Sequence, residues 1–376
     1  MKWRSRTIGD LVALQRGHDL TDAERKEGTV PVIGSGGPNG FHEVARAPGP
    51  GVTIGRSGSI GRVTFVEQDF CPHNTCIYVT DFKGNDPRFV AYLLSTLDLG
   101  QLNSGAAVPS LNRNFVYGVC VAYPDPPVQR RIAETLAAYD DLVENNRRRM
   151  ALLEEAARLL YREWFVRLRF PGHEHTRIVD GVPEGWERGC VSDFYSTSAG
   201  GTPSRTNPDF FTGDILWVKT QELLNGFVTD TEEKITEEAL NKSAAKLFPE
   251  RTVLVAMYGA TIGELGIIAR PAASNQACCA IIPRDARASF IHAFLFFREN
   301  KDKLVGLSMG AAQNNINQQI IRSYPMLMPA QRPMELFNET LKPAFDQWLN
   351  LQLQIPKLRA ARDFLLPRLM SGEIAV

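Results

Sequence analysis

The sequence predicts an α+β fold in which two tandem mixed α/β domains are separated by two long antiparallel coiled-coil helices. Three observations predict it: a sustained heptad pattern in the middle of the chain, a similar pattern at its end, and short motifs that recur at a nearly constant offset. Such a doubled chain would have approximate twofold symmetry.

The first heptad pattern occupies residues 128–170, where apolar side chains recur at alternating spacings of three and four. Pro126 and Pro127 precede it, and Pro171 and Gly172 follow it, as expected at helix ends. A helix of this length would be roughly 60 Å long, which is more than one domain buries. We therefore expect a partner helix, although a long helix buried in one domain is the alternative. The seam comprises Ile132, Leu136, Tyr139, Val143, Asn146, Met150, Leu153, Ala157, Leu160 and Trp164.

The second long helix is expected within residues 329–376. It keeps a less regular seam, in which Pro343 and Pro356 are predicted to kink or break the helix. This helix can bury its apolar stripe only by packing back on the first, so the two should run antiparallel. Its seam includes Trp348, Ile355, Leu365 and Leu369.

The internal repeat defines the domains. Residues 60, 74, 112 and 129 recur at 262, 275, 317 and 331, which gives offsets of 202, 201, 205 and 202. Residues 1–127 and 186–328 are therefore predicted to be two globular domains, with a polar linker at 171–185. In the first domain we expect strands at 30–33, 52–54 and 63–66, a glycine-rich turn at 34–40 and a helix at 87–97.

Composition limits the classes of function. Lys plus Arg and Asp plus Glu both number 42, so any nucleic-acid contact must come from a local patch. The charged N-terminus does not resemble a signal peptide. The sequence contains no apolar run of 18 residues, so we expect no membrane span. Six cysteines without a C-x-x-C pair indicate a reducing compartment, so we expect a cytoplasmic protein.

No motif predicts catalysis or a bound metal. Residues 125–128 imitate an (Asp/Asn)-Pro-Pro-aromatic methyltransferase motif, but Val128 replaces the aromatic residue. Pro38 and Asn39 spoil a dinucleotide-binding fingerprint in the turn at 34–40. The histidines show no base–nucleophile spacing. We therefore expect no catalytic residue, no metal site and no cofactor on this chain.

The segments 31–37, 55–61, 105–112, 127–133 and 365–374 together resemble the specificity subunit of type I restriction–modification systems, and the resemblance covers nearly the whole chain. It implies that each domain is a target-recognition domain that reads one half of a split double-stranded DNA sequence. It also implies that the helices set the spacer and dock two methyltransferase subunits, with restriction motor–nuclease subunits completing the complex. S-adenosylmethionine for adenine-N6 methylation, and ATP with Mg²⁺, would then bind to those partners.

The loop 55–62 is the first candidate DNA contact. Its small residues let the backbone approach DNA, its serines can donate hydrogen bonds, and its arginines can neutralise phosphates. A plain hairpin turn is the alternative. In the second copy Glu264 replaces Arg62, so the two loops cannot make the same contacts. The candidates in these two loops are Arg56, Ser57, Ser59, Arg62, Tyr258 and Thr261.

Amide and arginine side chains after each copy's small-residue stretch are candidates for contacting base edges. Turn and helix-cap chemistry is the alternative. These residues are Asn112, Arg113, Asn114, Gln313, Asn314 and Asn317, with Lys219 and Thr220 in a further candidate loop. The arginine run at 147–149 is either a solvated helix face or a partner or DNA contact.

Two other functions stay open at this point. The chain would be the recognition subunit of a two-subunit methyltransferase–nuclease, or a coiled-coil scaffold without a DNA role. The target sequence itself cannot be deduced from composition, because recognition domains read DNA through variable loops and DNA shape.

Overall fold

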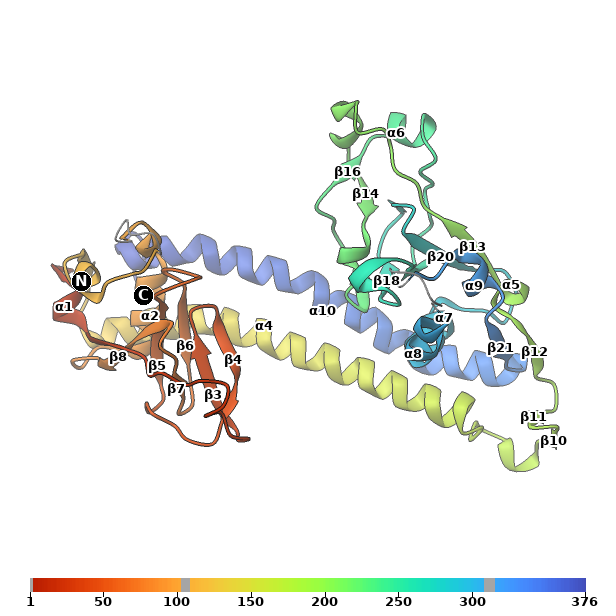
Figure 1. Cartoon of the computed structure of the whole chain (residues 1–376), viewed down its shortest axis with the longest axis horizontal. Helices are drawn as coiled ribbons and strands as arrows, with labels where there is room; N and C mark the ends of the chain where they lie inside the picture. Colours follow the sequence, from red (N-terminus) through yellow and green to blue (C-terminus); the bar gives the residue numbers. More distant parts are fainter. Residues whose placement is uncertain (1–2, 103–108, 308–314) are drawn as a thin grey trace. The chain divides into compact units, whose positions relative to one another are not determined.

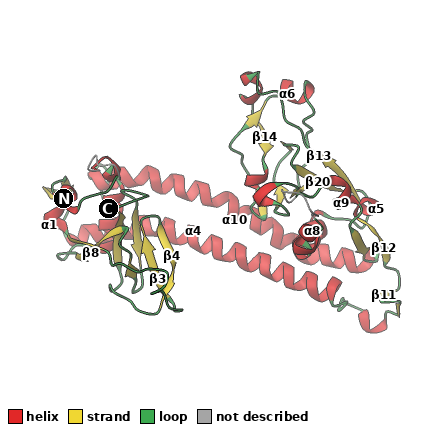
Figure 2. Ribbon diagram, viewed as in Figure 1, coloured by secondary structure: helices red, strands yellow, loops and turns green. Residues whose placement is uncertain are grey.

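The computed structural model describes residues 3–102, 109–307 and 315–376. The chain forms two compact units: unit 1 is Met1–Glu144 with Pro356–Val376, and unit 2 is Asn145–Ile355. Each unit combines strands with helices (Figure 2), as predicted. The boundary between the units falls inside both long helices, so each unit contains a segment of each helix.

Unit 1 is built on two sheets and a terminal strand pair. The larger sheet is antiparallel and has the order β2-β8-β5-β6, and the smaller has the order β4-β3-β7, with β3 and β7 parallel (Figure 1). The strands are β1 (Arg4–Thr7), β2 (Ala13–Arg16), β3 (Val30–Gly34), β4 (Gly37–His42), β5 (Gly51–Gly55), β6 (Val63–Val66), β7 (Cys71–Pro72), β8 (Cys76–Asp81) and β9 (Cys120–Tyr123), the last paired with β1. The helices are α1 (Ile8–Leu11), α2 (Pro87–Ser95), η1 (Leu99–Leu102) and α3 (Arg113–Tyr117).

Unit 2 repeats this plan. Its sheets have the orders β13-β20-β17-β18-β15 and β16-β14-β19, and β12 pairs with β21 as β1 pairs with β9. The strands are β12 (Glu187–Cys190), β13 (Tyr195–Ala199), β14 (Ile215–Val218), β15 (Gly226–Val228), β16 (Lys234–Ile235), β17 (Val253–Ala256), β18 (Leu265–Ile268), β19 (Ala272–Ser274), β20 (Cys278–Pro283) and β21 (Pro325–Met328). The helices are α5 (Val191–Phe194), η4 (Pro208–Phe211), η5 (Thr220–Glu222), α6 (Glu237–Asn241), η6 (Gly259–Thr261), α7 (Phe290–Glu299), α8 (Lys301–Gly306) and α9 (Gln318–Arg322).

The matching strand orders confirm the predicted tandem repeat. The main difference lies between the paired strands of the smaller sheets. In unit 1 two residues, Ser35 and Gly36, join β3 to β4. In unit 2 residues 219–233 join β14 to β16 and include β15, which extends the larger sheet. The glycine-rich turn predicted at 34–40 is thus much shorter than expected, because β4 already begins at Gly37 and pairs with β3.

The two predicted long helices are α4 (Pro126–Tyr161), which continues as the π-helix η2 (Arg162–Val166), and α10 (Gln331–Ser371). In unit 2 the ring of Tyr161 lies 6.3 Å from that of Phe337, and Asn146 Nδ2 donates to Gln354 Oε1 at 3.1 Å. In unit 1 Arg362 forms an ion pair with Asp140. From Asn146 to Tyr161 along α4 the partner on α10 changes from Gln354 to Phe337, so the two helices are antiparallel in unit 2, as predicted.

Seam positions on both helices are buried or half-buried, which agrees with the heptad pattern. Leu136 and Leu369 belong to the core of unit 1, and Trp348 belongs to the core of unit 2. Asn146 is buried although it is polar, and its hydrogen bond to Gln354 satisfies its amide. The seam positions with this burial are Leu136, Tyr139, Val143, Asn146, Met150, Leu153, Leu160, Trp164, Trp348, Ile355, Leu365 and Leu369.

The predicted interruption of the second helix is wrong, because α10 continues through Pro343 and Pro356. Both prolines are exposed, as is Glu339, whose carbonyl loses its N–H partner at Pro343 and can bind water instead. The neighbouring Phe345 and Trp348 are buried in the core of unit 2. Tertiary packing of this apolar face therefore outweighs the local cost of proline.

The segment expected to be an irregular linker is partly ordered. It contains a 3₁₀ turn, η3 (His173–His175), and a small hairpin of β10 (Ile178–Val179) with β11 (Val182–Pro183). Phe170 and Trp186, which flank it, are buried and their ring centroids lie 5.0 Å apart. This aromatic contact joins the two ends of the segment.

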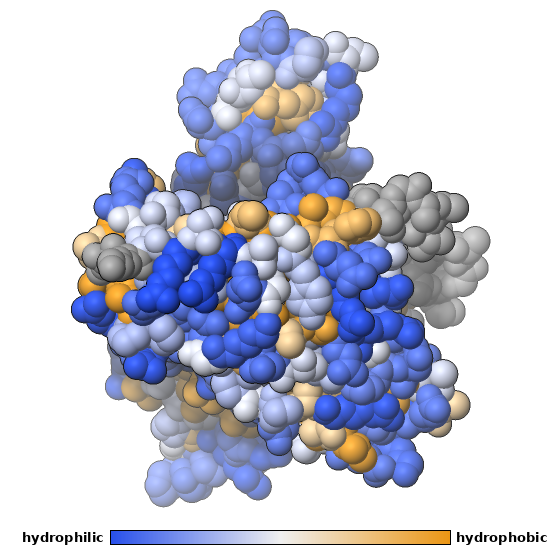
Figure 3. Space-filling model, turned by 90° about the vertical axis from the view of Figure 1, so that its left-hand side faces the viewer, coloured by the Kyte–Doolittle hydropathy of each residue, from blue (hydrophilic) through white to orange (hydrophobic). Residues whose placement is uncertain are grey.

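On the face that Figure 3 presents, hydrophilic residues predominate and apolar residues form smaller patches between them. Among the described residues, no helix has both the length and the apolar character needed to cross a membrane.

Candidate nucleic-acid interface

In unit 1 the loop between β5 and β6 is held by backbone hydrogen bonds. Arg56 N and Ser57 N donate to Thr75 O at 2.8 and 3.2 Å. Gly61 N donates to Gly55 O at 2.8 Å, and a Cβ atom at Gly55 would lie only 2.0 Å from Ser59 O. Glycine is therefore required at residue 55. The loop connects the antiparallel pair β5 and β6 as a hairpin, its backbone is bonded to residue 75, and it carries the predicted Arg56, Ser57, Ser59 and Arg62.

A second segment, far away in sequence, meets this loop. Leu111 N donates to Arg56 O at 2.8 Å. The side chain of Asn112 accepts a hydrogen bond from Asn114 N at 3.0 Å and so caps α3. Arg113 Nη1 donates to Leu14 O on β2 at 3.3 Å. The predicted loop residues of both segments are thus brought together, while Asn112 also has the cap role that was the alternative prediction.

A hollow of about 250 Å³ lies here, and three arginines line it: Arg16, Arg56 and Arg113. Asn112 and Ser110 supply polar groups, and its remaining lining residues are Ile77 and Leu111. We call the loop 55–62, residues 110–113 and the end of β2 the unit 1 edge. The sequence did not indicate Arg16, because only the pairing of β2 with β8 places this residue beside the other two arginines.

The unit 1 edge is locally positive although the whole chain is neutral. Arg16 forms an ion pair with Asp19 at 2.9 Å. A hydrogen bond from Asn74, followed by the charge of Arg16, lowers the pKa of Asp19 and keeps it ionised. Within the described part of the chain, no carboxylate forms an ion pair with the remaining arginines of the edge, which are Arg56, Arg62 and Arg113. Their charges are therefore available to an anionic ligand.

Unit 2 builds the same backbone frame. Met257 N donates to Ala277 O at 2.8 Å, and Ile316 N donates to Met257 O at 3.0 Å. Gln318 Nε2 donates to Thr197 O on β13 at 3.0 Å. These bonds repeat those of Arg56, Leu111 and Arg113. We call the loop 256–264, residues 315–318 and the end of β13 the unit 2 edge.

The unit 2 edge carries different side chains. Its loop has five residues, 258–262, where unit 1 has four, 57–60, and it presents Tyr258, which is 39% exposed, with the half-buried Thr261. Asn317 caps α9 by accepting from Ile320 N at 2.9 Å, as Asn112 caps α3. Two predicted contacts of this edge, Gln313 and Asn314, lie outside the described residues.

Glu264, which replaces Arg62, is a structural residue. Lys301 Nζ donates to Glu264 Oε1 at 2.6 Å, and Asn225 Nδ2 also donates to this carboxylate. Burial disfavours the charged carboxylate, but these hydrogen bonds outweigh it, so the pKa of Glu264 is lowered. Asn225 Oδ1 in turn accepts from Leu265 N at 3.2 Å. The acidic residue thus anchors residues 219–230 to the larger sheet of unit 2.

Lys219 is less available to DNA than predicted. Its ammonium group lies 2.6 Å from Glu232 Oε2 and 3.1 Å from Glu233 Oε2, and only 18% of its side chain is exposed. The hydrogen bond to Glu232 is the largest of the causes that raise the pKa of Lys219. A phosphate would have to displace these two carboxylates. Thr220, the other residue predicted here, is half-buried at the start of η5.

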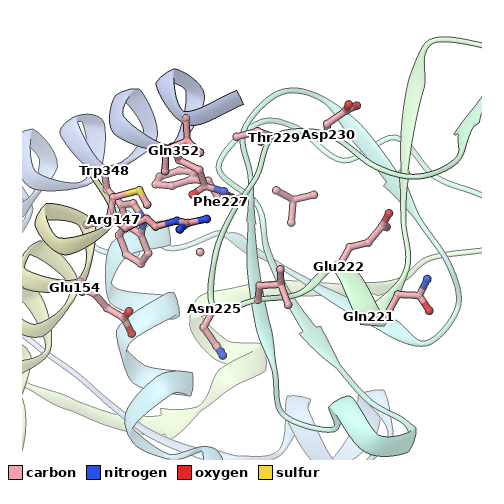
Figure 4. Close-up of a pocket in the computed structure, with 16 residues that line it drawn as sticks. Arg147, Glu154, Gln221, Glu222, Asn225, Phe227, Thr229, Asp230, Trp348 and Gln352 are labelled. Atoms are coloured by element: carbon pink, nitrogen blue, oxygen red, sulfur yellow. Dashed lines mark hydrogen bonds between the residues drawn. The ribbon is translucent and has the colours of Figure 1, made fainter. Parts of the chain in front are cut away.

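A second hollow, of about 740 Å³, lies in unit 2 between residues 221–230 and the helices α4 and α10 (Figure 4). Met150, Phe227 and Trp348 give it apolar walls, and Arg147 and Glu154 add charged groups. Gln352 donates to the Phe227 carbonyl and so attaches the segment to α10. No group of three or more His, Cys, Asp or Glu side chains in the described ranges could hold a metal ion.

Comparisons with known proteins agree with this architecture. A family model described as type I restriction modification DNA specificity domain matches residues 1–155 and again residues 183–333. The specificity subunit of the type I restriction enzyme MjaIX of Methanocaldococcus jannaschii is 25% identical over 301 residues, covering 77% of this chain and 69% of that protein. The specificity subunit of the HindI enzyme of Haemophilus influenzae is 23% identical over 387 residues, covering 84% of each chain.

The fold is also similar to a solved structure. The S subunit of a type I restriction–modification system from M. genitalium has a TM-score of 0.67 at 15% identity, covering 98% of this chain and 96% of that chain. At this identity the likeness concerns the fold alone.

Proposed function

We propose that this chain, which belongs to the family of type I restriction–modification DNA specificity domains and carries two of them, binds a bipartite DNA target with its two edges. The subunits of this family are not catalytic. The chain would therefore direct partner subunits to DNA: two methyltransferase subunits that modify adenine N6, and ATP-dependent restriction subunits.

One observation carries the proposal: the same hydrogen-bonded frame occurs twice in one chain and presents different side chains. In unit 1 it presents Arg56 and Arg113, and in unit 2 it presents Tyr258 and Gln318. A repeated frame favours the same kind of ligand in both units, and unlike side chains favour different sequences. Arginine can bond guanine and an amide can bond adenine in the major groove, which suits two unlike half-sites.

Partner docking would use the outer surface of the helices. Leu152, Leu159 and Val166 recur every seven residues along α4 and η2, and all three are exposed. An exposed apolar stripe of this kind favours a protein partner. In this proposal S-adenosylmethionine binds to the methyltransferase subunits, and ATP with Mg²⁺ binds to the restriction subunits.

Selection from a pool of random DNA duplexes tests the DNA role. The purified full-length chain should enrich duplexes with two short sequence motifs separated by a gap of constant length and random sequence. Replacing residues 57–60 by residues 258–262 should change one motif only. Enrichment of a single uninterrupted motif would contradict the two-edge proposal.

A failure to bind any duplex in a salt-dependent way would instead favour the coiled-coil scaffold.

A methylation assay tests the non-catalytic assignment. The isolated chain with S-adenosylmethionine and the selected duplex should transfer no methyl group, and transfer should appear when the partner methyltransferase subunit is added. Co-purification then separates the two DNA-dependent systems, since a distinct motor ATPase would support the type I complex over a two-subunit methyltransferase–nuclease.

A further inference from the structure

We infer that the two edges contact DNA with different chemistry: the unit 1 edge supplies most of the electrostatic attraction to phosphates, and the unit 2 edge acts mainly through uncharged groups. This inference rests on the proposed DNA-binding function. It assigns to unit 1 the salt-dependent part of the affinity, and to unit 2 a reading role that depends little on salt.

The repeated frame allows each edge arginine to be compared with its structural counterpart. Arg16 is paired with Ile77 on β8, and Ala199 is paired with Cys279 on β20, at the same place in the sheet. Gly17 N donates to Cys76 O and Gly200 N donates to Cys278 O, which confirms this alignment. The first arginine of the unit 1 edge is therefore replaced by alanine.

The other three arginines are replaced as well. The backbone bonds of Arg56 are made by Met257, whose side chain is only 2% exposed. The bond from Arg113 to Leu14 O is made in unit 2 by Gln318. Arg62 O and Glu264 O accept equivalent bonds from Gly55 N and Ala256 N. The four counterparts in unit 2 are Ala199, Met257, Glu264 and Gln318, none of which is a cation.

Cations near the unit 2 edge are mostly neutralised within the unit. Lys301 is paired with Glu264, while Lys219 and Arg205 are both paired with Glu233. Lys246 and Arg322 are exceptions, since no carboxylate of the described residues forms an ion pair with either of them. The ammonium group of Lys246 donates to Ser198 Oγ on β13 at 2.9 Å, and Arg322 ends α9. In the unit 1 edge, by contrast, only Arg16 has an ion pair with a described residue.

The expected consequence is quantitative. Each phosphate neutralised by a protein cation contributes about 0.9 to the slope of log affinity against log salt concentration. Removing Arg56 and Arg62 should therefore lower the slope by about 1.8. When the salt concentration rises fourfold, both proteins lose affinity. The fold-loss of the wild type should be about 12 times as large as the fold-loss of the variant.

The experiment compares two double variants of the full-length chain that remove the same total charge. R56Q/R62Q changes the unit 1 edge, and K219Q/K246Q changes the unit 2 side. Binding to a fluorescein-labelled mixed-sequence duplex is followed by anisotropy across a series of NaCl concentrations. We expect a slope reduction of about 1.8 for R56Q/R62Q and of less than about 0.9 for K219Q/K246Q. A thermal melt of each variant confirms that it is folded.

The outcomes separate this inference from the function on which it rests. Equal slope reductions in the two variants, or a larger one in K219Q/K246Q, would overturn the inference and leave DNA binding intact. Wild-type protein that binds the duplex without salt dependence, or does not bind it, would refute the proposed function itself.

As a reciprocal test, Q318R adds at the unit 2 edge the arginine that unit 1 has, and should raise the slope by about 0.9. An unchanged slope in this variant would show that the exchange of Arg113 for Gln318 does not set the salt dependence, and it would overturn the residue-by-residue comparison on which the inference is argued.

Discussion

The stability of unit 2 should fall in mildly acidic solution because of one buried histidine. His292 on α7 is 1% exposed and lies among the rings of Tyr161, Phe165 and Phe296. Its Nδ1 is hydrogen-bonded to the hydroxyl of Tyr195 at 2.9 Å. Burial lowers the pKa of His292 from 6.5 to about 3, because the charged imidazolium would lose its hydration.

The sign of the effect follows from the two pKa values. Above pH 6.5 the imidazole is neutral in both the folded and the unfolded chain, so its contribution to stability is fully present. Below pH 6.5 only the unfolded chain takes up the proton, until the folded pKa is reached at about 3. The free energy of unfolding should fall by about 1.36 kcal/mol per pH unit in this window. From pH 6.5 to pH 5 the loss is about 2 kcal/mol.

Between pH 6.5 and pH 5 the effect of His292 is separate from that of two carboxylates of unit 2 whose pKa values are strongly lowered. Glu233 and Asp285 of unit 2 both have a folded pKa of about 2, chiefly because arginine side chains donate hydrogen bonds to them. Their stabilising contributions decline only as the pH falls below their unfolded pKa values of 4.5 and 3.8. Neither group therefore alters stability between pH 6.5 and pH 5.

Urea unfolding followed by tryptophan fluorescence measures the effect. Four of the five tryptophans, at positions 164, 186, 217 and 348, lie in unit 2, so the signal reports mainly on that unit. The control is H292N, whose amide can still bond the Tyr195 hydroxyl but cannot take up a proton. The wild type should lose about 2 kcal/mol between pH 6.5 and pH 5, and H292N should lose much less. Parallel pH profiles for the two proteins would refute the reasoning.

Three further outcomes are expected. F337A should lower the free energy of unfolding of unit 2 by about 3–5 kcal/mol, because Phe337 is fully buried against Phe165 at 4.6 Å between ring centroids; a cost below about 1 kcal/mol in urea unfolding would contradict this. N146L should raise the midpoint of thermal unfolding, because it removes a buried polar group whose partner Gln354 is exposed and can bond water; a lower midpoint would show that the hydrogen bond is worth more than the apolar contact. A thiol reagent should modify the exposed Cys120 in the native protein, while the four buried cysteines, Cys71, Cys76, Cys278 and Cys279, should react only on unfolding. Burial raises the pKa of Cys76, for example, to about 12. Rapid modification of all six thiols in the native protein would disprove their burial.

The two long helices and the tandem repeat could be predicted from the sequence, because each produces a periodic pattern of residues. The seam of α4 is a heptad spacing sustained over many turns, and its residues are buried as expected. The repeat was visible as matched motifs, and the strand orders of the two units confirm it. The prolines of α10 misled the prediction, because the buried faces of Phe345 and Trp348 sustain the helix through them.

Less of the candidate interface could be predicted. The loops around Arg56 and Arg113 were recognised by their residue types, but Arg16 was missed. Lys219 was selected for its charge, although two carboxylates on a later segment neutralise it. The sequence showed Glu264 in place of Arg62, but only the structure shows its role. Its bonds to Lys301 and Asn225 anchor residues 219–230 to the larger sheet of unit 2. In each case the missing information was the identity of a neighbour distant in sequence.

By itself the sequence determined that this protein is a doubled α+β chain with two long helices, because hydrophobic periodicity and repeated motifs are local properties of a chain. Only the tertiary structure decided which arginines share one hollow and which side chains replace them in the other unit. Those relations depend on strand register and on hydrogen bonds between segments far apart in the sequence, such as the bond from Arg113 to Leu14 and the bond from Gln318 to Thr197, which join residues 99 and 121 positions apart. The strength of an electrostatic interaction depends on the distance between two groups in space, and their separation along the chain does not enter it.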